Sequence, residues 1–140
     1  MEIRASNEST LRFLTGLSGR LDSRMDVLVS EAGELAAESI RLMLSRNGQH
    51  AVGSRKGHAP VGETPRMETG NLHNSVQTVP ARKVGFGRYS AEAGPTARYA
   101  EFVDQGTRNM GARPYMDRAR VDAAIKMDRF LSMVAFELVR

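Results

Sequence analysis

The feature that most constrains the fold is a helical pattern of apolar residues between Asp22 and Arg46. Small and apolar side chains recur there at spacings of three and four, which is typical of an amphipathic helix with one buried face. Asp22 or Ser23 is a suitable N-cap and Gly48 a suitable stop. Such a helix is not stable alone, so other parts of the chain must cover it. The stripe consists of Met25, Leu28, Val29, Ala32, Leu35, Ala36, Ser39 and Met43, widened by Leu21 and Ile40.

A second long amphipathic helix is predicted from Pro114 to Val139. Pro114 suits the first turn of a helix, where the missing amide hydrogen of proline has no helical partner to lose. Apolar residues again recur at helical spacing, and one face of this helix should be buried. These residues are Met116, Ala119, Ala123, Met127, Phe130, Leu131, Val134 and Leu138.

The sequence between the two helices alternates as β-strands do. Ser75 to Val79 alternates with period two, Val84 to Phe86 extends this strand or begins the next, and Arg88 to Gly94 reads as its partner. Gly85 and Gly87 mark a turn or bulge between them. Two amphipathic helices that flank a small antiparallel sheet make an α+β fold. The 140 residues suit a single domain.

Two segments lie outside these elements. Residues 1–20 carry several large apolar side chains, interrupted by Gly16 and Gly19, which predicts either a short helix or an arm that docks on a neighbouring subunit. Residues 47–68 are rich in Gly and Pro, which oppose helix and strand and predict a long flexible loop. This loop is either a solvated connector or a segment that becomes ordered on a partner. Its candidate partner-contact residues are Arg55, Lys56, His58 and Arg66.

The composition excludes several classes of protein. The absence of Cys excludes a disulfide framework and a thiolate metal site. No apolar run approaches the roughly 20 residues that span a bilayer, and the first residues lack the apolar core of a signal peptide. We therefore expect no membrane partner and a chain that is made in the cytoplasm. The net charge of +4 leaves contact with a polyanion open.

A search for reactive constellations predicts no catalytic, metal or cofactor site. The His residues at 50, 58 and 73 have no carboxylate at metal-ligand spacing, and the serines lack a Gly-x-Ser-x-Gly elbow. Gly85-x-Gly87 lacks the third glycine of a phosphate-binding loop. Glu31, Glu34 and Glu38 repeat at helical spacing, which is typical of the solvated face of a helix. We therefore expect a protein that is not an enzyme.

Three short motifs carry more information than the composition. The first is TGNLHNSV from residue 69, the second is YAEFVDQGT from residue 99, and the third is ARPYM from residue 112. Their order and spacing resemble the tail-component family of long-tailed bacteriophages, small neck or tail-completion proteins, over roughly Pro60 to Ala119. The residues that carry the resemblance are Thr69, Gly70, Leu72, Ser75, Tyr99, Ala100, Val103, Gly106, Thr107, Arg113 and Pro114.

The residues of the second and third motifs also predict local structure. A short helix should open at Thr96 or Ala97 and end at Gly106, which should adopt a positive φ. Thr107 can cap the next turn. Arg113, extended because it precedes a proline, could place its guanidinium on the carboxylate of Glu101 or Asp104. These features brace the fold or contact a neighbouring subunit.

The resemblance implies a structural virion protein that forms a ring, by analogy a hexamer, at the neck or tail-completion interface. Its implied partners are further copies of itself, head-closure or connector proteins, tail-terminator or tail-tube proteins, and the genomic DNA that passes through the lumen. The implied location is the neck or tail of the virion, and the host cytoplasm during assembly. The alternative from a different class is a small basic nucleic-acid-binding protein that uses Arg55, Lys56, Arg118 and Arg120.

Overall fold

The protein consists of helices and one small sheet, so the α+β prediction is confirmed. The computed structural model describes residues 7–47, 60–67 and 69–139. The helices are α1 (Asn7–Ser45), α2 (Asn71–Asn74), α3 (Ala100–Gln105) and α4 (Met116–Val139), and the strands are β1 (Val76–Gly85) and β2 (Arg88–Pro95).

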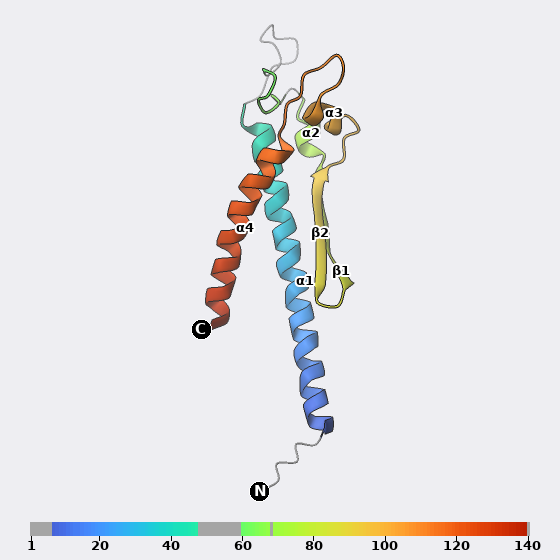
Figure 1. Ribbon diagram of the computed structural model, residues 1–140, viewed down its shortest axis with the longest axis vertical. Coiled ribbons are helices and arrows are strands. Elements are labelled where there is room, and N and C mark those ends of the chain that lie inside the picture. Colours follow the sequence, from blue (N-terminus) through green and yellow to red (C-terminus); the bar gives the residue numbers. More distant parts are fainter. Residues whose placement is uncertain (1–6, 48–59, 68, 140) are drawn as a thin grey trace.

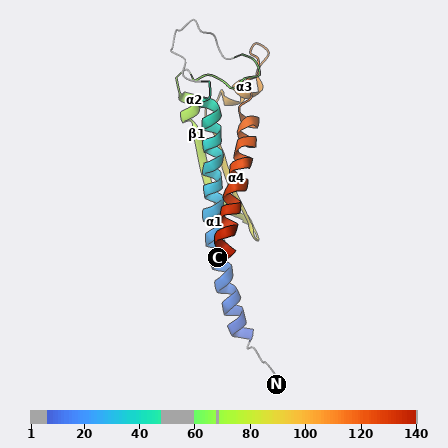
Figure 2. The same ribbon diagram turned by 90° about the vertical axis from the view of Figure 1, so that its left-hand side faces the viewer.

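Helix α1 forms the long axis of the molecule (Figure 1). The hairpin of β1 and β2 runs along one side of α1, and α4 runs antiparallel along another. In both ribbon views the N-terminal part of α1 extends beyond the hairpin and beyond the end of α4 (Figures 1 and 2). The remaining short elements, α2 and α3, lie together at the opposite end of the molecule.

Helix α1 begins earlier than its predicted N-cap at Asp22 or Ser23. It runs unbroken from Asn7, so the segment that was expected to be a short helix or a separate arm continues the long helix. A glycine inside a helix lowers helix stability by roughly 1 kcal/mol relative to alanine. Good helix formers around Gly16 and Gly19 can offset this cost, so the two glycines do not stop the helix. Leucines surround them, and there is no proline. The helix ends at Ser45, whereas Gly48 lies outside the described residues.

The hairpin follows the strand prediction closely. Its register pairs Val76 with Pro95 at one end and Gly85 with Arg88 at the other, so Phe86 and Gly87 form the turn. Gly87 has a φ of 63° there. Pro80, which has no amide hydrogen to donate, lies where the ladder shifts register between Val79 and Arg82. The next amide, of Ala81, donates instead to Oγ of Ser30 in α1 at 3.0 Å.

The core lies where the C-terminal half of α1 meets the start of β1 and the start of α4. Predicted stripe residues Ser39, Ile40 and Met43 are buried there, whereas Leu21 and Met25 are exposed. The buried face also includes residues outside the predicted stripe, because the hairpin and α4 cover two sides of α1. The core side chains are Ala37, Ile40, Met43, Leu44, Val76, Tyr115 and Ala119.

Polar contacts fix the hairpin along α1. Arg41 donates from Nη2 to the carbonyl oxygen of Val76 at 2.9 Å, and Lys83 Nζ lies 2.6 Å from Oδ2 of Asp22. The hydrogen bond from Lys83 lowers the pKa of the Asp22 carboxyl below its ordinary value. Near Gly33 the backbone of α1 approaches so closely that an added Cβ would lie 3.1 Å from Cβ of Ala91. An alanine at Gly33 would therefore require Ala91 to move by a few tenths of an ångström.

A second polar seam joins α1 and α4. Lys126 Nζ lies 3.1 Å from Oδ2 of Asp122 and 3.8 Å from Oε1 of Glu38. The hydroxyl of Ser39, followed by the Lys126 ammonium, lowers the pKa of Asp122 below its ordinary value. Helix α4 begins at Met116, so Pro114 precedes the helix. The prediction that Pro114 occupies the first turn is therefore wrong.

Candidate functional site

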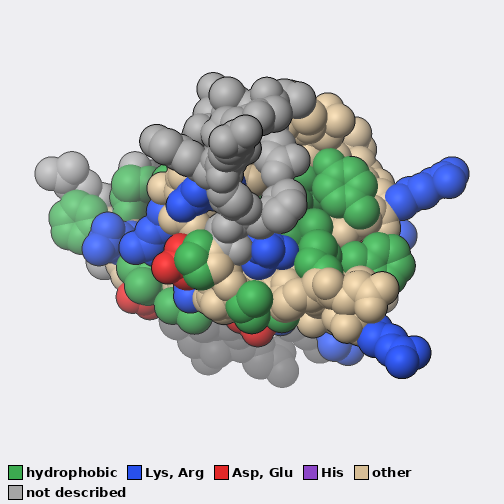
Figure 3. All heavy atoms as spheres, turned by 90° about the horizontal axis from the view of Figure 1, so that it is seen from above, with side chains coloured by type: hydrophobic (Ala, Val, Ile, Leu, Met, Phe, Trp, Pro, Cys, Tyr) green, Lys and Arg blue, Asp and Glu red, His purple; other side chains and the backbone are tan. Residues whose placement is uncertain are grey.

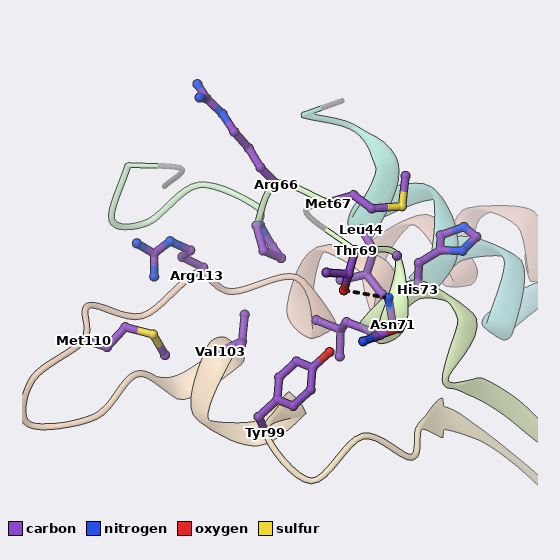
Figure 4. Close-up of a pocket in the computed structure, with 13 residues that line it drawn as sticks. Leu44, Arg66, Met67, Thr69, Asn71, His73, Tyr99, Val103, Met110 and Arg113 are labelled. Atoms are coloured by element: carbon purple, nitrogen blue, oxygen red, sulfur yellow. Dashed lines mark hydrogen bonds between the residues drawn. The ribbon is translucent and has the colours of Figure 1, made fainter. Parts of the chain in front are cut away.

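The three motifs meet at the end of the molecule where α2 and α3 lie. They surround a cavity of about 280 Å³ (Figure 4). Its wall continues through Leu44 at the C-terminal end of α1, so the cavity borders the hydrophobic core. Members of all three motifs line it, namely Thr69, Gly70, Leu72, Tyr99, Val103 and Arg113.

The first motif forms a tight turn that leads into β1. Gly70, with φ of 76°, precedes the single turn of α2. The amide of Asn71 donates to Oγ1 of Thr69 at 3.4 Å, and Ser75 donates from Oγ to the carbonyl of Leu72 at 2.7 Å. Leu72 packs against the core. Backbone and side-chain hydrogen bonds therefore direct the chain from the cavity wall into the sheet.

The second motif forms α3 and its end. Ala100 is buried and Val103 packs against the core, whereas Tyr99 is 44% exposed. The helix starts at Ala100, later than the predicted Thr96 or Ala97. Gly106 ends the helix with φ of 79°, which confirms the prediction of a positive φ. Its amide donates to the carbonyl of Phe102 at 2.9 Å.

Gly106 also sits where no side chain would fit. A Cβ built on it would lie 2.7 Å from the amide nitrogen of Ala112 and 2.8 Å from the carbonyl oxygen of Met110. Thr107 donates its amide to that same Met110 oxygen at 2.7 Å, and Asn109 donates its amide to Oγ1 of Thr107 at 3.4 Å. Thr107 therefore caps a tight turn, and the loop folds back onto the glycine.

Asp104 has a role that the sequence did not reveal. Its Oδ1 accepts the backbone amides of Tyr115 and Met116, each at 3.0 Å, and thereby caps the N-terminus of α4. A carboxylate at this place satisfies unpaired amides and opposes the helix dipole. It ties α3 to α4 across the loop. The sequence did not predict this cap, because an N-cap is expected directly before its helix and Asp104 lies in another helix.

Arg113 also ties this loop to α3, through its backbone. Its amide donates to the carbonyl of Val103 at 2.9 Å, and its Nη1 donates to the carbonyl of Gly111 at 3.4 Å. The predicted pairing of the Arg113 guanidinium with Glu101 or Asp104 stays a prediction. Pro114 follows in the extended segment that leads to α4.

Tyr115 is the buried anchor of this end, and it was not selected from the sequence as a site residue. Its side chain is 1% exposed and donates from the hydroxyl to the carbonyl of Ala100 at 3.2 Å. Burial, followed by the negative charge of Asp104, raises the pKa of Tyr115 to about 12. An aromatic residue in the first turn of the predicted second helix was the available signal.

The outer surface of this end is partly apolar. Tyr99 lines the cavity with a half-exposed ring, while Val61 and Phe102 are exposed nearby. Figure 3 looks down on this end and shows hydrophobic side chains beside those of Lys and Arg. Within the described ranges, no group of three or more His, Asp or Glu side chains could hold a metal ion.

The predicted partner-contact loop is described only in part. Arg55, Lys56 and His58 lie outside the described residues. Arg66 lines the rim of the cavity and points away from its centre (Figure 4). That these four residues contact a partner stays a prediction.

Two further sequence predictions concern charged helical faces. Glu31, Glu34 and Glu38 are exposed along α1, as a solvated face requires. Arg118 and Arg120 do not share a face, because residues two apart in a helix project about 200° apart. Arg118 donates to the carbonyl of Gly62 at 2.8 Å, and Arg120 pairs with a carboxylate of its own helix.

Comparisons with family models, with curated proteins and with solved structures found no match for this chain. In the part of the chain that the structure describes, no helix is both long and apolar enough to cross a membrane.

Proposed function

We propose that this chain is a structural subunit of a tailed bacteriophage or prophage particle. Copies of it would form a ring, six-fold by the family resemblance, at the neck or tail-completion interface. The ring would join head to tail around the DNA channel. Head-closure or connector proteins would contact one side and tail-terminator or tail-tube proteins the other. The role is mechanical, and no catalytic step is part of the proposal.

The observation that carries this proposal is the agreement of three motifs in order and spacing. Residues of all three line one cavity, where Gly106 and Asp104 brace the loop between α3 and α4. Residues that act together in one structural unit are a better basis for a resemblance than three isolated matches. The unit is built from backbone turns and caps, which suits a subunit that bears load.

A second line of support is the amount of apolar surface that the subunit exposes. Leu14 and Leu21 on α1 are exposed, and so are Val121, Ile125 and Phe136 on α4. Contiguous exposed apolar surface marks sites of protein association. Because these surfaces lie on different elements, contacts between unlike patches of neighbouring copies are possible, and such contacts close into rings when the rotation allows.

Removal of the gene tests this proposal. Particles should be produced in the strain that encodes the chain, with and without the intact gene, and examined by electron microscopy. We expect filled heads and complete but separate tails, and normal particles when the gene is supplied from a plasmid. Intact tailed particles in the absence of the gene would contradict the proposal.

The alternative function, nucleic-acid binding, is supported by the net charge of +4 alone. Phosphate-driven binding weakens steeply as salt concentration rises, because bound counterions are released. Titration of duplex DNA with the purified chain at low and at high salt distinguishes the two functions. High affinity at low salt that falls at least a hundredfold between the two conditions would favour the alternative.

A further inference from the structure

The apolar stripe of α1 follows a strict seven-residue repeat. Leucine occupies every seventh position from Leu14 to Leu42. A second series, offset by four, runs from Leu11 to Ser39. This alternation of three and four residues is the pattern of a coiled coil, in which the two series form a seam against another helix. The two series are Leu14, Leu21, Leu28, Leu35 and Leu42, and Leu11, Ser18, Met25, Ala32 and Ser39.

The chain itself supplies a helix for only the C-terminal part of this seam. Beside α4, Ser39 is buried and Leu28 and Leu35 are partly buried, whereas Leu42, the last leucine of the series, is 46% exposed. The same seam continues toward the N-terminus, where Leu14 is 52% exposed and Leu21 is 56% exposed. The N-terminal portion of this part extends beyond the hairpin and α4 in both ribbon views, and the hairpin reaches its border at Asp22, which Lys83 of β1 contacts (Figures 1 and 2). From residue 11 to residue 25 the uncovered seam is about 21 Å long.

Charges flank the uncovered seam asymmetrically. At 100° per residue, Arg24 projects to one edge of the stripe and Asp26 to the other. Arg20 projects to the back of the helix, and Asp22 already pairs with Lys83 of β1. Two parallel copies would place the basic edge of one helix against the acidic edge of the next. An antiparallel pair would place basic edge against basic edge, which is unfavourable. The charges therefore favour a parallel partner with the same sequence.

We propose that residues 11–25 of α1 form a parallel coiled coil with the same residues of other copies of this chain. Cyclic symmetry points all copies of a helix in the same direction along the axis, so a parallel contact is the one that a ring permits. Gly16 and Gly19 fall outside the two series of the seam and leave it unbroken. The inference deepens the proposed function and rests on the self-assembly within it, but the coil needs no head or tail component.

Paired substitutions on the two faces of α1 test the coil in solution. Leu21 lies in the seam and is 56% exposed. Val27 lies on the opposite face of the same helix and is 55% exposed. Leu21→Glu and Val27→Glu therefore add the same charge at equally exposed helical positions. Sedimentation equilibrium of the full chain should give a multiple of 15.4 kDa for the unchanged chain and for Val27→Glu. For Leu21→Glu, association should be at least tenfold weaker.

Single cysteines test the direction of the helices, because the chain has no Cys of its own. Ser18 lies in the seam and Ser23 on the opposite face, and each hydroxyl donates to a backbone carbonyl of the preceding turn at 2.9 Å. On mild oxidation, Ser18→Cys should form disulfide-linked dimers at least tenfold faster than Ser23→Cys. A parallel coil places the two copies of residue 18 opposite each other.

A monomeric unchanged chain, or equal behaviour of the two variants in either pair, would overturn the proposal. These measurements use the purified chain alone, so they separate the coil from the function in the particle. If the coil forms but particles remain intact without the gene, the proposed function fails alone. If the gene is required at the head–tail junction but the seam variants change nothing, the coil fails alone.

Discussion

Gly106→Ala should destabilise the protein more than any other single methyl group added at a glycine with positive φ among the described residues. The reason lies in two independent properties of Gly106. Its φ of 79° and ψ of 176° belong to a region that is essentially restricted to glycine. A Cβ there would also lie 2.7 and 2.8 Å from backbone atoms of the loop that folds back onto it.

The magnitude follows from these two terms. Occupying such a backbone region costs a non-glycine residue about 1–3 kcal/mol, and forcing an extra carbon into a packed site costs about 1–3 kcal/mol more. The clashing atoms belong to the backbone of Met110 and Ala112, and the Met110 carbonyl is already held by the amide of Thr107. They cannot move aside as a flexible side chain could. We expect a loss of roughly 2–6 kcal/mol in the free energy of unfolding.

Gly87→Ala is the matched control. Gly87 also has a positive φ, of 63°, but no atom lies within 4 Å of a Cβ built on it. This substitution should cost only the backbone term, about 1–2 kcal/mol. Urea unfolding followed by circular dichroism gives both free energies. If Gly106→Ala costs no more than Gly87→Ala, the argument that the loop closes against the glycine is wrong.

Substitutions at three further residues test other parts of the account. Asp104→Ala should lower the free energy of unfolding by about 0.5–2 kcal/mol through loss of the α4 cap, and Asp104→Asn, which keeps an acceptor oxygen, by less; urea unfolding of both measures this. Because the pKa of Tyr115 is raised to about 12, stability should be intact below pH 10 and fall by about 3 kcal/mol as pH rises to 12. Tyr115→Phe should remove this contribution and flatten the alkaline profile, and an unchanged profile would contradict the assignment. Gly33→Leu should cost about 1–3 kcal/mol by pushing the hairpin away from α1, and a thermal midpoint equal to that of the unchanged chain would contradict this.

The elements with a strong local pattern could be predicted from the sequence. The stripe around Ile40 and Met43, the alternation in β1 and β2, and the turn at Gly87 depend on neighbouring residues only. The positive φ of Gly106 was also predictable, because a glycine after a short helical pattern commonly ends the helix in this way.

The remaining features depend on contacts between distant segments. The start of α4 is set by Asp104, a residue of α3 that caps its first amides. The prediction from Pro114 placed this start too early. The buried face of α1 includes Ala37 and Leu44 because two elements cover it, and the stripe alone could not show this. The meeting of the three motifs at one cavity is likewise a property of the folded chain.

Electron cryomicroscopy of intact tailed particles that contain this chain tests the central claim most directly. We predict a closed ring of copies at the junction of head and tail, encircling the DNA channel, with the N-terminal parts of α1 packed against one another in parallel. Density for this chain at another place in the particle, or particles that lack the chain altogether, would contradict the claim.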